Sequence, residues 1–392
     1  MLPLQGVTVV SIEQAVAAPF ATRQLADLGA RVIKIERPGE GDFARRYDAT
    51  VRGQSSHFVW LNRSKESVTL DLKHADAGLI IGRLLERADV FVQNLVPGAA
   101  GRLGLDASVL RPRYPRLIVC DISGYGSNGP YKRKKAYDLL IQCETGVVSV
   151  TGTPEAPSKA GISVADIAAG MYGYSGVLTA LYQREKTGQG TAFEVSMFEA
   201  LGEWMGYPAY FAACGGTAPP RTGASHATIC PYGPFRTAGG KPVFLGIQNE
   251  REWKNFCASV LHQSELSADP RFVDNAARVA NRAQLVGIIE DVFMTLDAGE
   301  VIARLDAANI ANARLNTAQE FWEHPQLKAR DRWRQIDSPE GPLPALLPPT
   351  TMEGIEPRMG PVPSLGEHTR TVLTEFGFGA SQIDRLAREG AI

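Results

Sequence analysis

The chain has 392 residues, more than one compact hydrophobic core usually serves, so we expect two domains. Hydrophobic residues make up 44% of it and charged residues 21%, the balance of an ordinary globular protein. Its 41 basic and 42 acidic side chains leave a formal net charge of −1. This near-neutral balance argues against duplex nucleic acid and against a membrane surface as partners, because both attract a basic face.

Cysteine usage and the first residues favour the cytoplasm. The five cysteines are an odd number with no C-x-x-C spacing, so we expect reduced thiols rather than a disulfide framework or a zinc site. The N-terminus lacks the basic start and apolar stretch of a signal peptide, and no apolar run is long enough to span a bilayer. We therefore expect a cytoplasmic protein without a membrane partner.

Strand and helix patterns alternate along the first half of the chain. Short β-branched and apolar runs predict strands, and longer periodic runs closed by glycine predict helices. The predicted strands are 7–12, 31–36, 67–72, 89–93, 117–123 and 192–195. The predicted helices are 19–28, 75–87 and about 166–186, with two short ones at 368–376 and 381–389. Strand–helix–strand units wind right-handed into parallel sheets, so we predict an α/β fold with a Rossmann-like parallel sheet.

The composition changes after about residue 200, which indicates a second domain. Residues 214–240 are rich in Gly, Pro and Thr, 243–315 have the pattern of a short strand followed by helices, and 338–363 are rich in Pro. The domains we predict from this are a large one of residues 1–200 completed by 340–392, a smaller α+β one of 225–325, and linkers at 201–224 and 326–339.

Several chemistries lack their motifs. The turn at 13–19, after the first predicted strand, has none of the glycines with which a dinucleotide-binding turn approaches a pyrophosphate. No Walker A sequence and no G-x-S-x-G elbow occur, and residues 39–42 carry acidic groups where phosphates would sit. The six histidines include no H-x-x-x-H pair, so we predict no metal site. The chain thus has the scaffold of a nucleotide binder without NAD or ATP chemistry, and a scaffold loop with no ligand is the alternative.

One carboxylate has an unusual context. Asp166 lies in GISVADIAAG (161–170), just before a predicted helix in which Gly170, Gly173 and Gly176 recur every third position. Such small residues let another backbone or a ligand approach the helix closely. The N-terminus of a helix also favours an ionised carboxylate. From these residues alone, an ordinary N-cap aspartate is the alternative.

Six short motifs occur together in the order found in a known family. They are LGARVIKIERPGEGD at 28–42, NRSK at 62–65 with LDLK at 70–73, NLVPG at 94–98 with RLG at 102–104, SGYG at 123–126 with GP at 129–130, KTGQG at 186–190, and LGEHT at 365–369. On these motifs the sequence resembles class III CoA-transferases, the group of formyl-CoA, carnitine-CoA and succinyl-CoA:dicarboxylate transferases. The resemblance runs from residue 7 to about 195 and is loose over 240–330.

The resemblance implies roles for individual residues. Asp166 falls on the family's nucleophilic aspartate. The residues that fall on its coenzyme A contacts are Val16, Ala17, Arg37, Leu70, Asp71, Leu72, Lys73, Asn94, Leu95, Val96, Arg102, Lys135, Ala136, Tyr137 and Asp138. At Val16 the chain departs from formyl-CoA transferases, which carry Gln there. The basic members suit the phosphates of coenzyme A, although without the resemblance they would be ordinary surface charges.

The resemblance also implies covalent catalysis without a permanently bound cofactor, with coenzyme A entering as the acyl-CoA substrate. Transfer between a thioester and a carboxylate is nearly balanced in energy, in agreement with the missing P-loop. Each attack builds an oxyanion, for which the turn at 16–18 and the segment 239–246 are candidate hosts. A non-catalytic coenzyme A-binding protein on the same scaffold is an alternative.

A racemase is the rival within the same fold. α-Methylacyl-CoA racemases carry Gly-His-Asp where this chain has Ala136, Tyr137 and Asp138. Racemisation needs an acid or base on each face of the reacting carbon, and a phenol with a pKa near ~10 is a poor replacement for histidine. This position favours the transferase.

The acid substrate and the assembly are further expectations. Residues 221–236 offer Arg221, His226, Tyr232 and Arg236, and a distal carboxylate would need such partners, so we expect a small dicarboxylate. A structural linker, a monocarboxylate, and transfer between two carboxyls of one molecule are the alternatives. The resemblance implies an interlocked homodimer, with which the long irregular segments are compatible.

Overall fold

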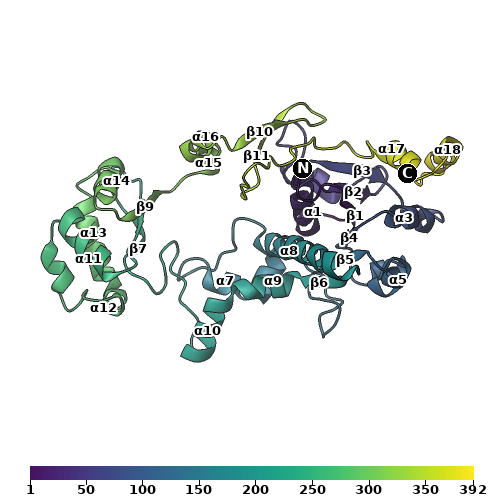
Figure 1. Cartoon of the computed structure of the whole chain (residues 1–392). Coiled ribbons are helices and arrows are strands. Elements are labelled where there is room, and N and C mark those ends of the chain that lie inside the picture. Colours follow the sequence, from purple (N-terminus) through teal and green to yellow (C-terminus); the bar gives the residue numbers. More distant parts are fainter. The chain divides into compact units, whose positions relative to one another are not determined.

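The computed structural model describes all 392 residues and divides into two compact units. The larger unit comprises residues 1–145, 160–206 and 327–392, and the smaller comprises 146–159 and 207–326. Figure 1 labels the helices and strands of both. No helix in the structure combines the length and the apolar character that crossing a membrane requires.

A six-stranded parallel sheet forms the centre of the larger unit, as the sequence predicted. Its order is β3-β2-β1-β4-β5-β6, so the chain adds strands to one side of β1 and then to the other. The strands are β1 (Thr8–Ile12), β2 (Arg31–Glu36), β3 (Lys65–Thr69), β4 (Val90–Gln93), β5 (Ile118–Ser123) and β6 (Ala192–Ser196). The apolar runs of β1, β4 and β5 suit a sheet that is covered on both faces.

Strand β3 begins and ends earlier than the predicted 67–72. Its register with β2 runs from Val32 opposite Lys65 to Glu36 opposite Thr69, so pairing ends where β2 ends. Leu70 and Leu72, which extended the apolar pattern, pack into the core from the loop that follows. Hydrophobic pattern alone does not tell a buried loop residue from a strand residue.

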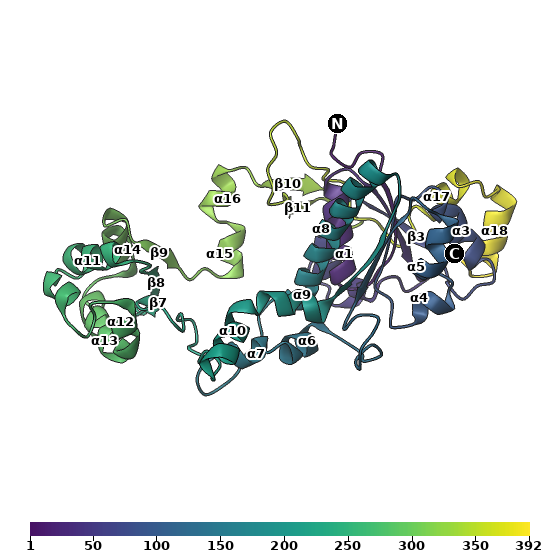
Figure 2. The ribbon, with the colours of Figure 1, turned by 60° about the horizontal axis from the view of Figure 1, so that its bottom comes forward.

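Helices cover both faces of the sheet (Figures 1 and 2). On one face lie α1 (Ala17–Asp27) and α8 (Val164–Thr187), which pack against each other. On the other face lie α3 (Ala77–Leu85), α5 (Ala107–Arg113), α17 (Thr369–Glu375) and α18 (Ala380–Arg388). The largest apolar core joins this second layer to the sheet, with Phe91 and Ile80 fully buried in it.

Shorter elements complete the larger unit. They are η1 (Phe43–Arg46), α2 (Ser56–Asn62), α4 (Ala99–Arg102), α6 (Asp138–Glu144), α9 (Met197–Trp204) and the hairpin of β10 (Trp333–Ile336) and β11 (Leu343–Leu346). Helices α10 (Gly206–Gly215) and α16 (Pro325–Ala329) span the points where the chain passes from one unit to the other. The hairpin lies partly in the Pro-rich segment, which has no periodic pattern in the sequence.

The C-terminal segment protects the edge of the sheet at β3. The His368 N–H donates to the Ser67 carbonyl, and the Gly366 N–H donates to the Ser67 hydroxyl. The Thr69 N–H donates to the Thr369 hydroxyl. These bonds satisfy an edge that would otherwise be open to another strand.

The smaller unit has its own core around a three-stranded antiparallel sheet. Its strands are β7 (Tyr232–Phe235), β8 (Val243–Gly246) and β9 (Ala311–Arg314), in that order. Its helices are α7 (Val147–Val150), α11 (Glu250–Asn255), η2 (Phe256–Val260), η3 (Ser264–Ala268), α12 (Asn275–Ala280), α13 (Arg282–Phe293), α14 (Ala298–Ala307) and α15 (Ala318–Trp322). Trp253, Phe256 and Phe293 are fully buried at its centre. The sequence predicted only one of the three strands, because β7 and β9 are short and polar or proline-containing.

Candidate active site

The carboxyl ends of the parallel strands gather most of the predicted site residues at one edge of the sheet. Residues 16–17 follow β1, Arg37 follows β2, 70–73 follow β3 and 94–96 follow β4. Parallel strands end at the same edge, and β1 and β4 flank the point where the strand order reverses. In open α/β sheets this is where ligands bind.

The turn after β1 is held from both sides. The Asn94 side chain accepts the Gln14 N–H and donates to the Gln14 carbonyl, both at 2.9 Å. The Ala15 N–H donates to Asp42 at 3.0 Å, and Ala15 has a positive φ of 63°. A non-glycine residue in that conformation is strained unless its surroundings fix it. The side chain of Asn94, a predicted coenzyme A contact, is thus engaged by this turn.

Helix α1 begins directly after the turn with no side-chain cap. Val16 is its N-cap, and Val16, Ala17 and Ala18 are all buried. The N–H groups of these three residues form no hydrogen bond within the chain. Free N–H groups and the helix dipole make this end attractive to negative charge.

Asp166 lies in the first turn of α8 rather than at its N-cap, which is Ser163. A Cβ on Gly170 would lie 2.7 Å from the Ala17 carbonyl oxygen, and one on Gly173 would lie 3.5 Å from the Ala21 Cβ. Both glycines therefore allow α8 to approach α1 closely, as their spacing in the sequence predicted. Later residues of α8 meet later residues of α1, so the two helices run in the same direction. Asp166, one turn before Gly170, accordingly lies beside the turn after β1.

The electrostatics of Asp166 differ from those of a surface carboxylate. Burial, together with the neighbouring Asp138 carboxylate, raises the pKa of Asp166 to about 7. Burial and the charges of Asp42 and Asp166 raise the pKa of Tyr47 to about 12, with Tyr137 also contributing. Tyr47, between η1 and α2, therefore belongs to the same cluster. No sequence signal pointed to Tyr47, which lies outside the family motifs.

Asp138 starts helix α6, and its side chain is directed at α8. Its Oδ1 accepts the Ala165 N–H at 2.8 Å and lies 3.4 Å from the Asp166 N. Its Oδ2 accepts from Gln142 at 2.7 Å. Asp138 was predicted as a coenzyme A contact, but both of its carboxylate oxygens are occupied within the protein. Gln142, fully buried, was not predicted because nothing in its sequence context separates it from other helix residues.

The other predicted coenzyme A contacts differ in accessibility. Leu70 is buried, and Leu72 and Leu95 pack on the core, so a ligand would meet their backbone. Arg37 is exposed and pairs with Glu40. The exposed remainder consists of Lys73, Val96, Arg102, Lys135 and Tyr137, whereas Asp71 and Ala136 are half-buried.

Four fully buried charges lie beneath the site, and the sequence did not predict them. Lys65 donates to Glu13 at 2.7 Å, and Lys34 donates to Asp42 at 2.7 Å. Burial lowers the pKa of Lys65 to about 8 against the opposing charge of Glu13. Burial would raise the pKa of Glu13, but Lys65 and Lys34 hold it below its usual range. The signal available in the sequence was a lysine in or beside each of two predicted strands.

Comparison with known proteins identifies the family. Residues 4–369 match CoA-transferase family III. The acetyl-CoA:oxalate CoA-transferase of Acetobacter aceti is 35% identical over 331 residues, which cover 84% of this chain and 85% of that protein. The succinyl-CoA:glutarate CoA-transferase of Mus musculus is 30% identical over 397 residues, which cover 100% of this chain and 91% of that protein. The chain belongs to CoA-transferase family III.

Solved structures agree with this assignment. A CAIB/BAIF family protein from Brucella suis is 31% identical, with a TM-score of 0.83 over 96% of this chain and 99% of that one. Rv3272 from Mycobacterium tuberculosis is 27% identical, with a TM-score of 0.83 over 94% and 98%. The resemblance drawn from the six motifs is confirmed: the protein is a class III CoA-transferase that moves CoA between an acyl-CoA thioester and a carboxylic acid.

Both arginines expected to recognise a distal carboxylate have partners within the smaller unit of the transferase. Arg221 donates to the carbonyls of Thr153, Ser149 and Pro154. Arg236 pairs with Glu290 at 2.6 Å. Their hydrogen-bonding groups fasten loops and strands, which fits the structural-linker alternative better than a free carboxylate anchor.

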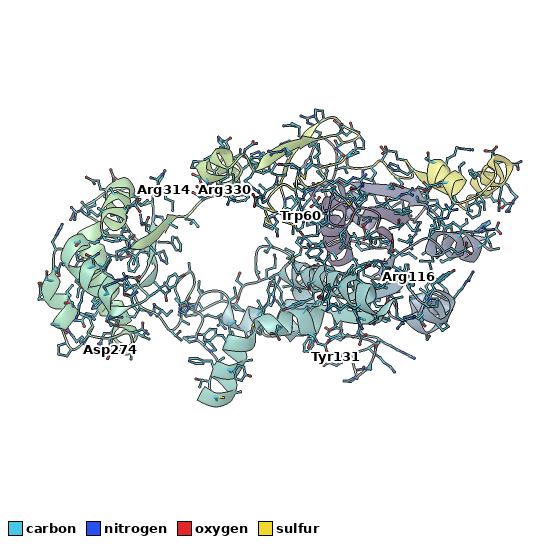
Figure 3. The ribbon with its side chains drawn as sticks, viewed as in Figure 1. Trp60, Arg116, Tyr131, Asp274, Arg314 and Arg330 are labelled. Atoms are coloured by element: carbon cyan, nitrogen blue, oxygen red, sulfur yellow. The ribbon has the colours of Figure 1, made fainter.

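The loop after β5 carries a run of cations at the edge where the strands end. Tyr131, labelled in Figure 3, stacks edge-on against Tyr125, and Lys134 lies 4.3 Å from the centre of the Tyr131 ring. Lys134 also pairs with Glu144, which fixes the loop to α6. Lys132 and Lys135, close to Lys134 in the same loop, are exposed. The loop is thus held against α6 through Lys134, and its other lysines are exposed to solvent.

Proposed function

We propose that this transferase works through a covalent intermediate on Asp166 and accepts a small dicarboxylic acid. The observation that carries the proposal is a half-buried carboxylate with a pKa near 7, placed beside the uncapped start of α1. A carboxylate kept from full solvation is a stronger nucleophile than one in water, and the adjacent N–H groups suit the oxyanion that its attack creates.

The reaction needs four balanced steps. An Asp166 oxygen attacks the thioester carbonyl, the C–S bond breaks, and an aspartyl–acyl anhydride forms with release of CoA thiolate. The thiolate attacks the Asp166 carbonyl carbon, its C–O bond breaks, and the donor acid leaves as a carboxylate. The acceptor carboxylate then attacks the aspartyl–CoA thioester, the C–S bond breaks, and a second anhydride forms with release of CoA thiolate. The thiolate attacks the acceptor acyl carbonyl of this anhydride, the C–O bond to Asp166 breaks, and the new acyl-CoA leaves with the Asp166 carboxylate restored. No net charge or proton is gained or lost.

The oxyanion of each step would be bound by the N–H groups of Val16, Ala17 and Ala18. Asn94 and Asp42 support this, because they fix the turn from which α1 starts. Donors that are already in place cost no reorganisation during the reaction. The substitution of Val16 for the glutamine of formyl-CoA transferases leaves backbone groups as the donors from this turn.

Coenzyme A would lie along the carboxyl edge of the sheet. Its diphosphate and 3′-phosphate suit the exposed cations Arg37, Lys73, Arg102 and Lys135, each of which follows a strand end. The backbone at 70–72 and 94–96 would line the path. We assign this role to the large domain of residues 1–200 and 340–392, and we propose 225–325 as a separate small domain.

Relatives support a dicarboxylate. The names of two proteins that match most of this chain specify oxalate and glutarate as acids. Both have two carboxylates and differ in length, so the names support the class without selecting a member. Transfer between the two carboxyls of one molecule would use the same steps.

The covalent step is tested by mass spectrometry. Incubation with succinyl-CoA, without an acceptor, should place a CoA adduct on the peptide that contains Asp166. Asp166→Asn should carry no adduct and should lose transferase activity by several orders of magnitude, because the covalent route is gone. An Asp166→Asn enzyme with a tenth of wild-type turnover would refute the assignment.

The acid is tested with a panel. Oxalate, malonate, succinate, glutarate, malate and mesaconate should be accepted from succinyl-CoA in preference to formate, acetate and carnitine. Preference for any monocarboxylate over every dicarboxylate would refute the substrate class. Arg221→Ala and Arg236→Ala should leave the KM for the acid unchanged, because both guanidinium groups already bind protein groups.

We further propose an interlocked homodimer located in the cytoplasm. Exposed apolar side chains on α10 support the dimer, since a stable monomer rarely keeps such a helix in water. The free thiols Cys143 and Cys214 are exposed, which suits a reducing compartment.

A further inference from the structure

Hydrogen bonds hold the Asp138 carboxylate at the start of α8. It accepts from the Ala165 N–H at 2.8 Å, the Asp166 N–H at 3.4 Å and the Gln142 amide at 2.7 Å. These bonds fix the position of the carboxylate beside Asp166.

Gln142 is oriented by a second hydrogen bond. Its side chain is fully buried, and its Oε1 accepts the Ala160 N–H at 2.9 Å. The amide nitrogen must therefore point at Asp138, four residues earlier on the same face of α6. Gln142 thus joins three segments: α6, the stretch before α8, and α8 itself through Asp138.

A fixed negative charge beside Asp166 affects its two chemical states differently. The free carboxylate is repelled by Asp138, whereas an acylated Asp166 is neutral and is not repelled. Repulsion thus raises the free energy of the free state relative to the acylated state. The raised pKa of Asp166 points in the same direction, because protonation removes the charge of this carboxylate just as acylation does.

We propose that Asp138, oriented by Gln142, is a positioning residue whose charge beside Asp166 favours the covalent states in which Asp166 is neutral. The inference rests on the proposed covalent route through Asp166. It assigns Asp138 a role other than contact with coenzyme A, because neither carboxylate oxygen is free.

Other titratable groups near Asp166 do not supply this charge. Asp138, from α6, is the charged group that acts on the Asp166 carboxylate. Tyr47 and Tyr137 are the phenols of the cluster, and Asp42 acts on Tyr47 while its own charge is paired with Lys34. None of them is an anion free to replace Asp138.

The partition between the free enzyme and the aspartyl–CoA thioester, in which Asp166 is also neutral, is directly measurable. Enzyme with succinyl-CoA and added succinate exchanges to aspartyl–CoA enzyme and succinate, and intact-mass spectrometry gives the equilibrium ratio at each succinate concentration. At pH 8 the free carboxylate is ionised. Asp138→Asn keeps an acceptor for the Ala165 N–H but removes the charge.

We expect Asp138→Asn to lower this equilibrium constant about tenfold, and to move the acid limb of kcat/KM down by on the order of one pH unit. The KM for acyl-CoA should change less than the equilibrium constant, since the phosphate contacts lie elsewhere. Asp384→Asn, which removes an exposed charge from α18 in the same unit, is the matched control and should change neither quantity.

A double variant that preserves the hydrogen bonds is needed in case Asp138→Asn alone destabilises the fold. In Asp138→Asn with Gln142→Glu, the new amide can donate to the new carboxylate, which can still accept the Ala160 N–H. The network is complete, but the charge lies one side chain further from Asp166. This variant should recover the melting temperature of the wild type while the acid limb stays below the wild-type position.

The outcomes separate the two proposals. If the wild type forms no adduct on Asp166, the covalent function fails. If the wild type forms it, but the single and double variants both keep the wild-type equilibrium constant and acid limb, Asp138 is only a helix cap and this inference is overturned.

Discussion

At the scale of single residues, the site depends on charges that are kept out of water. Asp166 is destabilised as an anion by burial and by Asp138, whereas Glu13 and Lys65 are buried as a pair. An unpaired buried charge costs far more than a paired one. Ionised Asp166, the proposed nucleophile, therefore lowers the stability of the fold, whereas the buried pair of Glu13 and Lys65 compensates for its own burial.

The cost at Asp166 gives a stability prediction with a definite sign. Its pKa is about 7 in the folded protein, against an ordinary value of 3.8 for a solvated aspartate, so ionisation favours the unfolded chain. Stability should fall as pH rises from about 4 to about 7, and the whole cost should remain above 7. Asp166→Asn should accordingly melt at a higher temperature than the wild type at pH 8, with a difference that shrinks toward pH 4.

Thermal unfolding followed by circular dichroism at pH 5 and pH 8 measures this difference. Asp384→Asn, an exposed aspartate of the same unit, provides the comparison and should show no such trend. A lower melting temperature for Asp166→Asn at pH 8 would contradict the electrostatic account of the site.

Removal of one partner from the buried Glu13–Lys65 pair should lower the free energy of unfolding. Lys65→Met removes the 2.7 Å ion pair of Glu13, so the only cation left near it is Lys34 at 3.4 Å, while the Thr22 hydroxyl still donates to it. Breaking a buried ion pair costs about 3–5 kcal/mol. Urea unfolding should show a loss of that size, and Glu13→Gln combined with Lys65→Met should recover part of it because no unpaired carboxylate remains. A loss under about 1 kcal/mol for the single change would mean that water reaches Glu13.

At the scale of elements, the strands of the parallel sheet could be predicted because a short β-branched or apolar run marks each of them. Five of the six strands are largely buried, whereas the edge strand β6 is buried only at Ser196, and β3 is displaced from its prediction by the apolar loop at 70–72. Helix α8 was predicted because Gly188 ends it in a left-handed conformation. Short elements such as α2, α6 and β7 carry too few periodic residues to give a signal.

The candidate site was predictable only where residues fall on positions of the family pattern. The resemblance predicted Asp166 and the strand-end residues, but it did not predict the contacts of Tyr47 and Lys65, which join distant parts of the chain. Trp60 is a similar case: it comes from α2 and lies 5.6 Å, ring to ring, from Phe20 of α1 (Figure 3). Sequence spacing holds no information on such contacts, because the partners come from different elements.

The distance between α1 and α8 should be set by Gly170. A methyl group there would lie 2.7 Å from the Ala17 carbonyl and 3.0 Å from the Phe20 Cβ, so Gly170→Ala must separate the helices. Asp166 is one turn away and would move from the start of α1. We expect kcat to fall at least about tenfold, since small displacements of a nucleophile are costly.

Gly78→Ala is the matched control for that change. Gly78 is also inside a helix, α3, but nothing lies within 4 Å of a Cβ placed on it. Alanine there should stabilise the protein by about 0.5–1 kcal/mol and leave activity unchanged. Equal activity for the two variants would show that the helix separation does not position Asp166.

At the scale of the whole molecule, the exposed apolar surface of α10 favours a protein partner. Helix α10 has no buried residue although almost all of its side chains are apolar, and Tyr207 and Tyr210 are exposed by 51% and 75%. Exposed apolar side chains gathered on one helix are typical of a protein interface.

A second copy of the chain is the partner we expect, so light scattering should give twice the chain mass of 42.4 kDa, unchanged by dilution to micromolar concentration. Tyr210→Glu introduces a charge into the apolar surface of α10, and burying it unpaired would cost several kcal/mol. That variant should therefore show a lower melting temperature that depends on protein concentration, or a monomer mass. Leu79→Glu, on the half-exposed face of α3 in the larger unit, also introduces a charge at an exposed apolar position and should keep the dimer mass. A wild-type monomer would refute the dimer, and equal behaviour of the two variants would place the interface elsewhere than α10.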